Sequence, residues 1–483
     1  MSSKETIMAS TTNSGIEKRS IEMVPDAERH GTPRSQFTLW FGANTQITAI
    51  VDGALAVVFG ADALWAIIGL LIGNIIGGIV MALHSAQGPQ LGLPQMISSR
   101  AQFGIIGAII PLVLVVLMYI GFASTGAVLS GQAVNLIIGV QTPWIGIVIF
   151  GALTALVALL GYKYIHVLGR ISSVTGLLGF LFITYCVLTQ VDVPGLISGS
   201  SFAFPAFLSA IALSVGWQLT YGPYVADYSR YLPRSTPASK TFWFTFGGSV
   251  IGSQWSMTLG ALIGAAAMTE SGNLFVENQV AYVGDIVGGG VFALLIFIVI
   301  LLGKLTVNTL NAYGAFMCTL TILTSFGNKA TIRRWTRAVF VIGIVSLTVL
   351  VALLASADFL ANFKNFVLAL LMVFTPWSII NLTDYYLISK DRFDIPAFYD
   401  RNGRYGAWNW RALASYGIGV VVQIPFLAQS FYTGPMVAKL GGADISWLVG
   451  IVVTFVLYYL LIRNRGVAPK ETIYPTLEEL ERK

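Results

Sequence analysis

The chain has 483 residues, of which 55% are hydrophobic and only 10% are charged, and its formal net charge is +6. Soluble domains carry about 25% charged residues, so this composition excludes a soluble globular protein. The two cysteines, Cys186 and Cys318, lie in apolar runs and form neither a disulfide framework nor a metal-ligand pattern. We therefore expect a membrane protein whose partners are lipid and a small molecule, without nucleic acid, metal or cofactor.

Apolar runs of membrane length recur along the whole chain. A bilayer core about 30 Å thick requires about 20 apolar residues in a helix, and the third and eighth runs exceed one crossing. The candidate spans lie near residues 37–58, 63–83, 105–137, 143–161, 171–190, 203–226, 243–268, 289–323, 338–357, 366–388, 412–431 and 445–463. They predict an all-α polytopic membrane protein with about twelve transmembrane helices. We expect polar tails at 1–34 and 466–483, the first largely disordered and without a secretory signal.

Lysine and arginine gather in alternate connections between these spans. The basic residues of this set are Lys18, Arg19, Arg29, Arg34, Arg100, Lys163, Arg170, Arg230, Arg234, Lys240, Lys329, Arg333, Arg334, Arg337, Lys390, Arg392, Arg401, Arg404, Arg411, Arg463, Arg465 and Lys470. The opposite connections carry only Lys364 and Lys439. The positive-inside rule then predicts that both termini lie in the cytoplasm, and we expect the protein in the plasma membrane.

The first span is interrupted by polar residues and glycines. Residues 42–53 read GANTQITAIVDG. Polar backbone at membrane depth is tolerated only where it faces protein or a water-filled cavity. Discontinuous helices place free N–H and C=O groups where substrate or ions can bind. We expect Asn44 and Gln46 to contact substrate; the alternative is a helix whose polar side chains pack against neighbours.

The sixth span contains a comparable interruption. Residues 212–228 read ALSVGWQLTYGPYVADY, and Gly222 with Pro223 weakens a helix. Trp217, between Gly216 and Gln218, offers an indole face on which a planar heteroaromatic ligand would stack, although a core or interfacial tryptophan fits equally well. Two broken spans, five helices apart, predict an inverted-repeat transporter with its site at the membrane midplane.

The eighth span places Lys304, Asn308 and Asn311 in apolar surroundings. Asparagine offers a donor and an acceptor, which suits the edge of a nucleobase or a ring amide. A lysine in mid-membrane is a functional hypothesis by default, and Asp52 is the acid expected to pair with it. The alternative is an ion pair that only locks two helices together.

In the third span, Phe122 and Ser124 are candidates to reach the cavity, and Gly121, Gly126 and Gly131 predict tight helix packing. The three histidines, His30, His84 and His166, are expected near loops or helix ends. No phosphate loop, nucleophile elbow or dinucleotide fingerprint occurs, which argues against an enzyme and against an ATP-driven pump.

Three motifs at span ends resemble one family. SSRAQFG at 98–104, DYSRYLP at 227–233 and PWSIINLTDYYLISKDRFD at 376–394 resemble the nucleobase-cation-symport family, also called purine-cytosine permeases. The resemblance covers about residues 30–465. It implies a five-plus-five inverted repeat of the LeuT type within a transporter domain at 35–465. The repeats would lie at about 37–190 and 203–389, followed by two extra helices at about 411–463.

The resemblance also implies roles for residues. Gly216 with Trp217 would form the stacking face, and Asn308 with Asn311 would pair with the ring edge. In sodium-coupled members the first and eighth helices form the ion site, here about 44–47 with Gly303 and Thr306. Val307 stands where those relatives place a second hydroxyl, and Lys304 adjoins, so we expect protons rather than sodium. The string NTLNAY and residues 406–419 resemble the fungal-type branch.

These features together predict proton-coupled import of a nucleobase by alternating access. Cytosine and purines such as adenine, guanine and hypoxanthine are the expected substrates. One alternative is a carrier on the same fold for allantoin, hydantoin, pyridoxine or a thiamine-like ring, with sodium coupling possible. An amino acid carrier, a channel and a membrane-embedded enzyme are further alternatives, and the oligomeric state is open.

Overall fold

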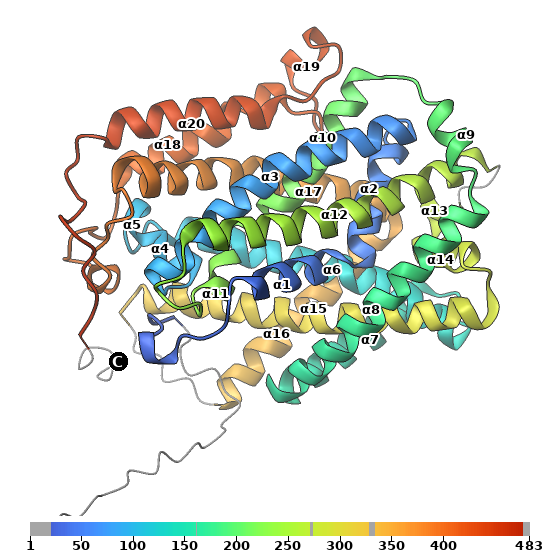
Figure 1. Cartoon of the computed structure of the whole chain (residues 1–483), viewed down its shortest axis with the longest axis horizontal. Coiled ribbons are helices and arrows are strands. Elements are labelled where there is room, and N and C mark those ends of the chain that lie inside the picture. Colours follow the sequence, from blue (N-terminus) through green and yellow to red (C-terminus); the bar gives the residue numbers. More distant parts are fainter. Residues whose placement is uncertain (1–20, 161, 271–273, 328–333, 477–483) are drawn as a thin grey trace, which may run out of the picture.

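The computed structural model describes residues 21–160, 162–270, 274–327 and 334–476, and this part is built from helices (Figure 1). The longer helices are α1 (Arg34–Asn44), α2 (Ile47–Val58), α3 (Ala63–Leu91), α6 (Ile109–Ile138), α7 (Pro143–Leu160), α8 (Tyr162–Gln190), α10 (Phe204–Leu219), α12 (Ala238–Thr269), α15 (Gly290–Thr324), α16 (Arg334–Ala355), α17 (Phe359–Leu382), α18 (Trp410–Val421) and α20 (Ser446–Ile462). The short ones are α4 (Gln95–Ser98), α5 (Arg100–Phe103), α9 (Val193–Ser198), α11 (Val225–Ser229), α13 (Leu274–Glu277), α14 (Gln279–Ile286) and α19 (Pro435–Lys439). A π-helical turn, Thr383–Ile388, follows α17.

Each of the twelve predicted spans overlaps at least one helix, which confirms the prediction of an all-α polytopic membrane protein. Among the described residues, seven helices are long and apolar enough to cross a membrane, and the bent pair α1–α2 makes an eighth span. One of the seven, Trp335–Ile388, is a run of 54 residues that contains both α16 and α17. At 1.5 Å per residue it is about 80 Å long, enough for two crossings of a core about 30 Å thick.

The prediction of one continuous span at 412–431 is wrong. Helix α18 has 12 residues and ends at Val421, and a 3-10 turn at Ile424–Phe426 follows. Pro425 contributes no N–H to a helix, which explains why the helix does not continue through this turn. Helix α18 alone is therefore about 18 Å long, shorter than the hydrocarbon core.

Both predicted interruptions are confirmed. Helices α1 and α2 meet at Thr45 and Gln46 with a bend of 61°. Helix α10 ends at Leu219, and a turn containing Gly222 and Pro223 separates it from α11. Each interruption therefore places backbone that is not helical in the middle of the molecule.

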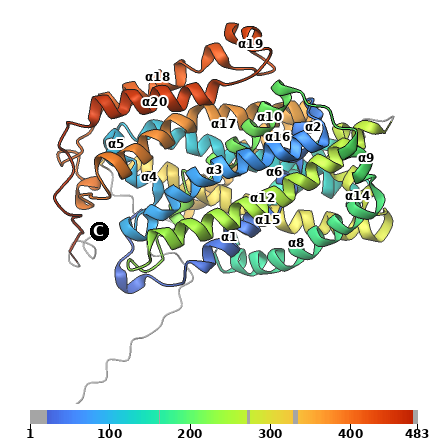
Figure 2. The same ribbon diagram turned by 45° about the horizontal axis from the view of Figure 1, so that its top comes forward.

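The helices form two groups by contact. In the first, α3 packs along α10 and α12, and α1 and α2 pack along α12. In the second, α6 packs along α15, and α7, α8 and α16 surround this pair. Helices α17, α18 and α20 contact one another, and α18 and α20 lie on one side of the molecule in both views (Figure 1, Figure 2). The two interruptions belong to the first group and face α6 and α15 of the second.

Glycines allow the closest approach within the first group. A Cβ atom on Gly53 of α2 would overlap the backbone of Met257 on α12, and a Cβ atom on Gly260 would overlap the carbonyl of Ile50. Small residues let helix backbones meet in this way, and α2 is therefore held firmly against α12.

The described parts of the two tails dock on the same end of the molecule. In the N-terminal part, Met23 and Val24 are buried, and the Val24 N–H donates to the Gly92 carbonyl (2.9 Å). In the C-terminal part, Ile473 forms a parallel bridge with Asp394. The expected disorder concerns residues 1–20, which lie outside the described residues. We call this end of the molecule the terminal end.

Hydrogen bonds connect the three sequence motifs at the terminal end, one of them through Gln95, which lies three residues before the first motif. The Asp227 carboxylate accepts a hydrogen bond from the Gln95 N–H (2.7 Å). Gln102 donates to Asp384 (2.8 Å) and accepts from Asn381 (3.3 Å). Segments that lie far apart in the sequence are thus joined by buried side-chain hydrogen bonds.

The expectation for His84 is wrong. Helix α3 continues past the predicted end of the span, through Pro89 to Leu91, and His84 is fully buried within it. Its ring stacks on Trp377 (centroids 4.8 Å apart, 17° between planes), and Nδ1 lies 3.3 Å from Gln95 Nε2. Buried polar residues are stable when they find partners, so the polar composition after residue 83 does not end the helix.

Some of the basic residues that suggested the orientation have structural partners. Arg100 is 2% exposed and donates to the Phe398 carbonyl (3.0 Å) and to Ser325 Oγ (3.0 Å). Lys18, Arg19, Lys329 and Arg333, and the side chains of Lys163, His166 and Arg334, lie outside the described residues. The orientation of the chain in the membrane stays a prediction.

Candidate functional site

Asn44, the last residue of α1, connects the first interruption to the second. Its Oδ1 accepts hydrogen bonds from Trp217 Nε1 (2.7 Å) and from the Tyr221 hydroxyl (3.2 Å). Its Nδ2 donates to the Trp40 carbonyl (2.7 Å) and to Ser249 Oγ (3.1 Å). A side-chain amide has two donors and two acceptor positions, so this one is fully used. In this conformation Asn44 positions the indole of Trp217 and leaves no group for a ligand.

Trp217 lies in an aromatic cluster and is 2% exposed. It packs edge-to-face with Phe122 (centroids 5.8 Å apart, 89°) and with Tyr221 (6.1 Å, 81°). A Cβ atom on Gly216 would lie 3.0 Å from Val367 Cγ1 and 3.2 Å from the Val367 carbonyl. The absence of a side chain at Gly216 therefore allows close packing against α17. The structure does not support the expected approach of a ligand to its backbone.

Lys304 reaches the first interruption from α15. The side chain is 3% exposed, and Nζ donates to Gln46 Oε1 (3.0 Å) and Thr48 Oγ1 (2.7 Å). Gln46 is itself oriented by a hydrogen bond from Nε2 to the Ala43 carbonyl (2.8 Å). The ammonium group thus connects the two helix groups at the break. Thr48 was not among the predicted site residues, although it lies in the polar string that marked the interruption.

Asp52 does not pair with Lys304, and this expectation is wrong for the described residues. Asp52 is fully buried, and neither carboxylate oxygen has a hydrogen-bond partner in the described part of the chain. The Lys304 ammonium is held at the start of α2 by Gln46 and Thr48. Asp52 lies one helical turn further along α2 and receives no hydrogen bond from it.

Asn308 and Asn311 carry polar atoms without partners. Asn308 Nδ2 donates to the Ala123 carbonyl (2.7 Å), while Asn308 Oδ1 and Asn311 Nδ2 have no hydrogen-bond partner among the described residues. A Cβ atom on Gly126 would overlap Asn308 Oδ1 and lie 2.7 Å from Lys304 Cε. Helix α6 therefore lies directly against the polar face of α15, as the small-residue spacing predicted.

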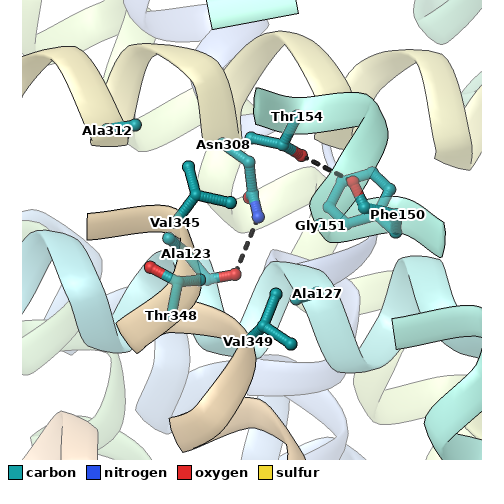
Figure 3. Close-up of a pocket in the computed structure, with 10 residues that line it drawn as sticks. All are labelled: Ala123, Ala127, Phe150, Gly151, Thr154, Asn308, Ala312, Val345, Thr348 and Val349. Atoms are coloured by element: carbon teal, nitrogen blue, oxygen red, sulfur yellow. Dashed lines mark hydrogen bonds between the residues drawn. The ribbon is translucent and has the colours of Figure 1, made fainter. Parts of the chain in front are cut away.

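A small cavity of about 10 Å³ lies behind Asn308 (Figure 3). Its walls include Phe150, Thr154 and Thr348, and it lies between α6, α7, α15 and α16. A volume of this size accommodates about one water molecule. The cavity does not include Trp217, so it is not the expected site for a ring.

The hydroxyl groups of two predicted site residues, Ser124 and Thr306, form hydrogen bonds with other helices. Ser124 Oγ donates to the Ile120 carbonyl (2.8 Å) and the Thr348 carbonyl (3.0 Å), which ties α6 to α16. Thr306 Oγ1 lies 3.0 Å from Ser172 Oγ of α8. The structure therefore does not bring Ser124 to Trp217, and it does not bring Thr306 to Lys304.

Gln218 is bonded within a network of buried side chains, and Gly303 has open space beside it. Gln218 Nε2 donates to Asn74 Oδ1 (3.1 Å) and Ser253 Oγ (2.8 Å), and its Oε1 accepts from Ser249 (2.7 Å). This buried network connects α3, α10 and α12 on the side away from Phe122. A Cβ atom on Gly303 would meet no atom within 4 Å. The residues that the structure does join are Asn44, Gln46, Phe122, Trp217, Lys304 and Asn308, together with Thr48 and Tyr221.

The sequence of this chain is similar to those of known proteins. A family model described as "Permease for cytosine/purines, uracil, thiamine, allantoin" matches residues 23–450. The "Putative purine-cytosine permease YxlA" of Bacillus subtilis is 39% identical over 451 residues, which is 93% of this chain and 96% of the relative. Purine-cytosine permease FCY22 of Saccharomyces cerevisiae is 29% identical over 324 residues, which is 65% of this chain and 58% of the relative.

A solved structure has the same fold. The inward-facing conformation of Mhp1 matches with a TM-score of 0.75 at 19% sequence identity, over 95% of this chain and 98% of that chain. At this identity the likeness concerns the fold alone.

Proposed function

The chain belongs to the family of permeases for cytosine/purines, uracil, thiamine and allantoin, and from this premise we propose that it imports a nucleobase together with protons. Membership makes it a multi-pass membrane transporter of nucleobase-like substrates and not an enzyme. Two purine-cytosine permeases, one bacterial and one fungal, are among its relatives, so we place it in the purine-cytosine branch.

The observation that supports a nucleobase best is the pair of unsatisfied amide atoms on α15. Asn308 Oδ1 is an acceptor and Asn311 Nδ2 is a donor, and residues three apart are neighbours on one helix face. An unpaired buried polar group costs about 1–3 kcal/mol, which a ligand with a matching edge would recover. Cytosine and the purines combine such an edge with a flat ring, for which Trp217 offers a stacking face.

The choice of protons rests on Lys304 and Asp52. The Lys304 ammonium places a positive charge beside the interrupted helix, where it would repel a sodium ion. Thr306, a proposed sodium ligand, has its hydroxyl engaged with Ser172. Asp52 is a buried acid without a partner in the described residues, and burying an isolated carboxylate is costly. We propose that Asp52 carries the coupled proton and that Lys304 senses it.

The helix groups must move during the transport cycle because Trp217 is buried. With 2% of its surface exposed, the indole becomes accessible only when the group α1, α2, α3, α10 and α12 shifts relative to α6, α7, α8, α15 and α16. We propose that repeats at about 37–190 and 203–389 supply these groups, that helices at about 411–463 are additional, and that the terminal end faces the cytoplasm. Rocking of the groups around a fixed site is alternating access.

Uptake with competition tests the substrate class. Labelled cytosine or adenine should enter cells that express the protein in a saturable way, and an excess of an unlabelled nucleobase should block it. Competition by allantoin, hydantoin, pyridoxine, thiamine or an amino acid, with none by nucleobases, would assign another substrate and overturn the proposal.

Two variants separate the roles of Trp217 in that assay. Trp217→Phe keeps a ring but loses the hydrogen bond to Asn44, whereas Trp217→Ala loses both. Stacking of a base on an aromatic ring is worth about 1–3 kcal/mol, so Trp217→Ala should raise the Kd about 5- to 150-fold and Trp217→Phe should raise it less. Equal affinity of Trp217→Ala and the wild type would remove the indole from the site.

A further inference from the structure

Aromatic residues recur at helical spacing from Trp217 through the second interruption. Tyr221, Tyr224 and Tyr228 follow it at intervals of four, three and four residues, and each ring contacts the next. Successive ring centroids lie 6.1, 5.9 and 6.5 Å apart. We call these four residues the aromatic stripe. It leads from the candidate site to α11, which lies near α1 and α4 in Figure 1.

Two helices flank the stripe. Trp40 of α1 packs against Tyr221 (5.3 Å), Tyr224 (6.3 Å) and Tyr228 (5.5 Å). Tyr119 of α6 lies 5.3 Å from Tyr224. Rings from both helix groups therefore meet at Tyr224, which is the point where the groups would separate.

The exposure of the rings increases along the stripe. Trp217 is 2% exposed and Tyr221 is 7% exposed, Tyr224 is half-buried, and Tyr228 is 37% exposed. The stripe thus connects the buried indole with the surface of the terminal end. A stripe that served only as core packing would stay buried and would have no need of hydroxyl groups, whereas each ring after Trp217 is a tyrosine.

The rings suit a polar flat molecule. Each neighbouring pair in the stripe is edge-to-face, with interplanar angles of 81°, 64° and 65°, so the edge of one ring covers the face of the next, and a face becomes free for a base when the helix groups separate. Bases stack on aromatic side chains with little dependence on their identity, and tyrosine adds a hydrogen-bonding group at the ring edge. Aliphatic side chains in the same place would bind a polar base poorly.

We infer that Tyr224 and Tyr228, with Trp40 and Tyr119 beside them, form a second stacking site for a planar heteroaromatic base, between Trp217 and the terminal end. This inference rests on the proposed function. The Tyr221 hydroxyl donates to Asn44 Oδ1, and Asn44 also accepts from Trp217. A base that moves from Trp217 to Tyr224 passes the residue that holds the first interruption in place, so its passage is linked to the separation of the helix groups.

The test measures the KM for labelled cytosine or adenine from each side of the membrane. Right-side-out and inverted membrane vesicles are prepared, and a terminal affinity tag locates the terminal end. Tyr224→Leu should raise the KM on the terminal side about 5- to 100-fold, because a stacking contact is lost there, and leave the KM on the opposite side unchanged. Tyr224→Phe keeps the ring and loses only the hydroxyl, so its KM on the terminal side should lie between those of the wild type and Tyr224→Leu.

Further variants keep the test decisive. Tyr228→Leu, at a partly exposed position, should show the same one-sided change and serves if Tyr224→Leu does not fold. Tyr282→Leu removes a buried tyrosine on α14, away from the stripe, and should change neither KM. An equal change of KM on both sides, or none on either, overturns the inference. Failure of the wild type to transport any base would instead overturn the proposed function.

Discussion

At the scale of single residues, Lys304 is the position that tests the proposed coupling ion. Its ammonium group donates to Gln46, at the bend between α1 and α2, and to Thr48 in the first turn of α2. A lysine at membrane depth is expensive and marks a functional position by default. Asp52, one turn further along α2, is buried without a partner among the described residues. Asp52 thus follows the interruption in the sequence and Lys304 reaches it from α15, but among the described residues no hydrogen bond joins the acid and the base.

Replacing Lys304 tests whether it takes part in coupling. Lys304→Met keeps most of the volume and removes the charge, so uptake of base should lose its dependence on external pH. Lys304→Arg keeps a positive charge and should retain part of that dependence. Initial uptake rates from acidic to neutral pH provide the comparison. A wild-type pH profile in Lys304→Met would leave the lysine with a structural role only.

Replacing Asn308 tests whether this residue recognises the edge of the base. Asn308→Ala removes the unpaired acceptor and should weaken base binding by about 1–3 kcal/mol, that is about 5- to 150-fold in Kd. Asn362→Ala is the matched control, because Asn362 is exposed on α17 and donates only to the Ala355 carbonyl among the bonds found. Binding of labelled base to each purified variant gives the two Kd values. The same Kd in Asn308→Ala and Asn362→Ala would exclude the ring edge from this position.

At the scale of elements, the bend between α1 and α2 depends on tight packing of α2 against α12. Asn44 and Gln46 supply the side chains at the bend, and Gly53 lets α2 meet the Met257 backbone directly. The half-helix is short, so its position is determined by neighbours more than by its own propensity.

Substitution of Gly53 should therefore destabilise the protein. Gly53→Ala places a Cβ atom against the Met257 backbone, and overpacking of this kind costs about 1–3 kcal/mol. Gly42→Ala on α1 meets no atom within 4 Å and should be neutral or slightly stabilising, because alanine favours the helix. The apparent Tm of each purified variant measures these changes in stability. A Tm for Gly53→Ala as high as that for Gly42→Ala would contradict the packing described here.

Element positions could be predicted where the sequence contains a local cause. Polar residues with flanking glycines marked the first interruption, and Gly222 with Pro223 marked the second, because these residues weaken a helix wherever it packs. The extension of α3 through His84 could not be predicted, since it depends on partners from α4 and α17 that are remote in sequence. Likewise, the polar side chains of Ser124 and Gln218 have partners that only the tertiary arrangement supplies.

At the scale of the whole molecule, three motifs join at the terminal end. Each motif was visible in the sequence as a resemblance, but its physical role follows from the contacts among Asp227, Gln95, Gln102, Asn381 and Asp384. These bonds connect α4 to α11, and α5 to the end of α17 and the π-helical turn that follows it. We expect opening of the terminal end to break such bonds, which would stabilise the conformation described here.

Weakening this network should open the terminal end. Gln102→Ala removes the bonds to Asn381 and Asp384, and the half-buried Cys318 on α15 then serves as a natural reporter. Its alkylation by a maleimide, followed by mass spectrometry, should become faster, while that of the buried Cys186 should not change. Unchanged alkylation of Cys318, or an equal increase at both cysteines, would show that these hydrogen bonds do not hold the terminal end closed.

Accumulation of base in proteoliposomes under a single imposed gradient tests the central claim, proton-coupled import, most directly. Labelled cytosine or adenine is supplied either with an inward proton gradient in the absence of sodium or with an inward sodium gradient at equal pH. We expect accumulation above equilibrium with the proton gradient alone, and its loss when a protonophore is added. Accumulation driven by sodium alone, or no accumulation of either base in either condition, would contradict the account.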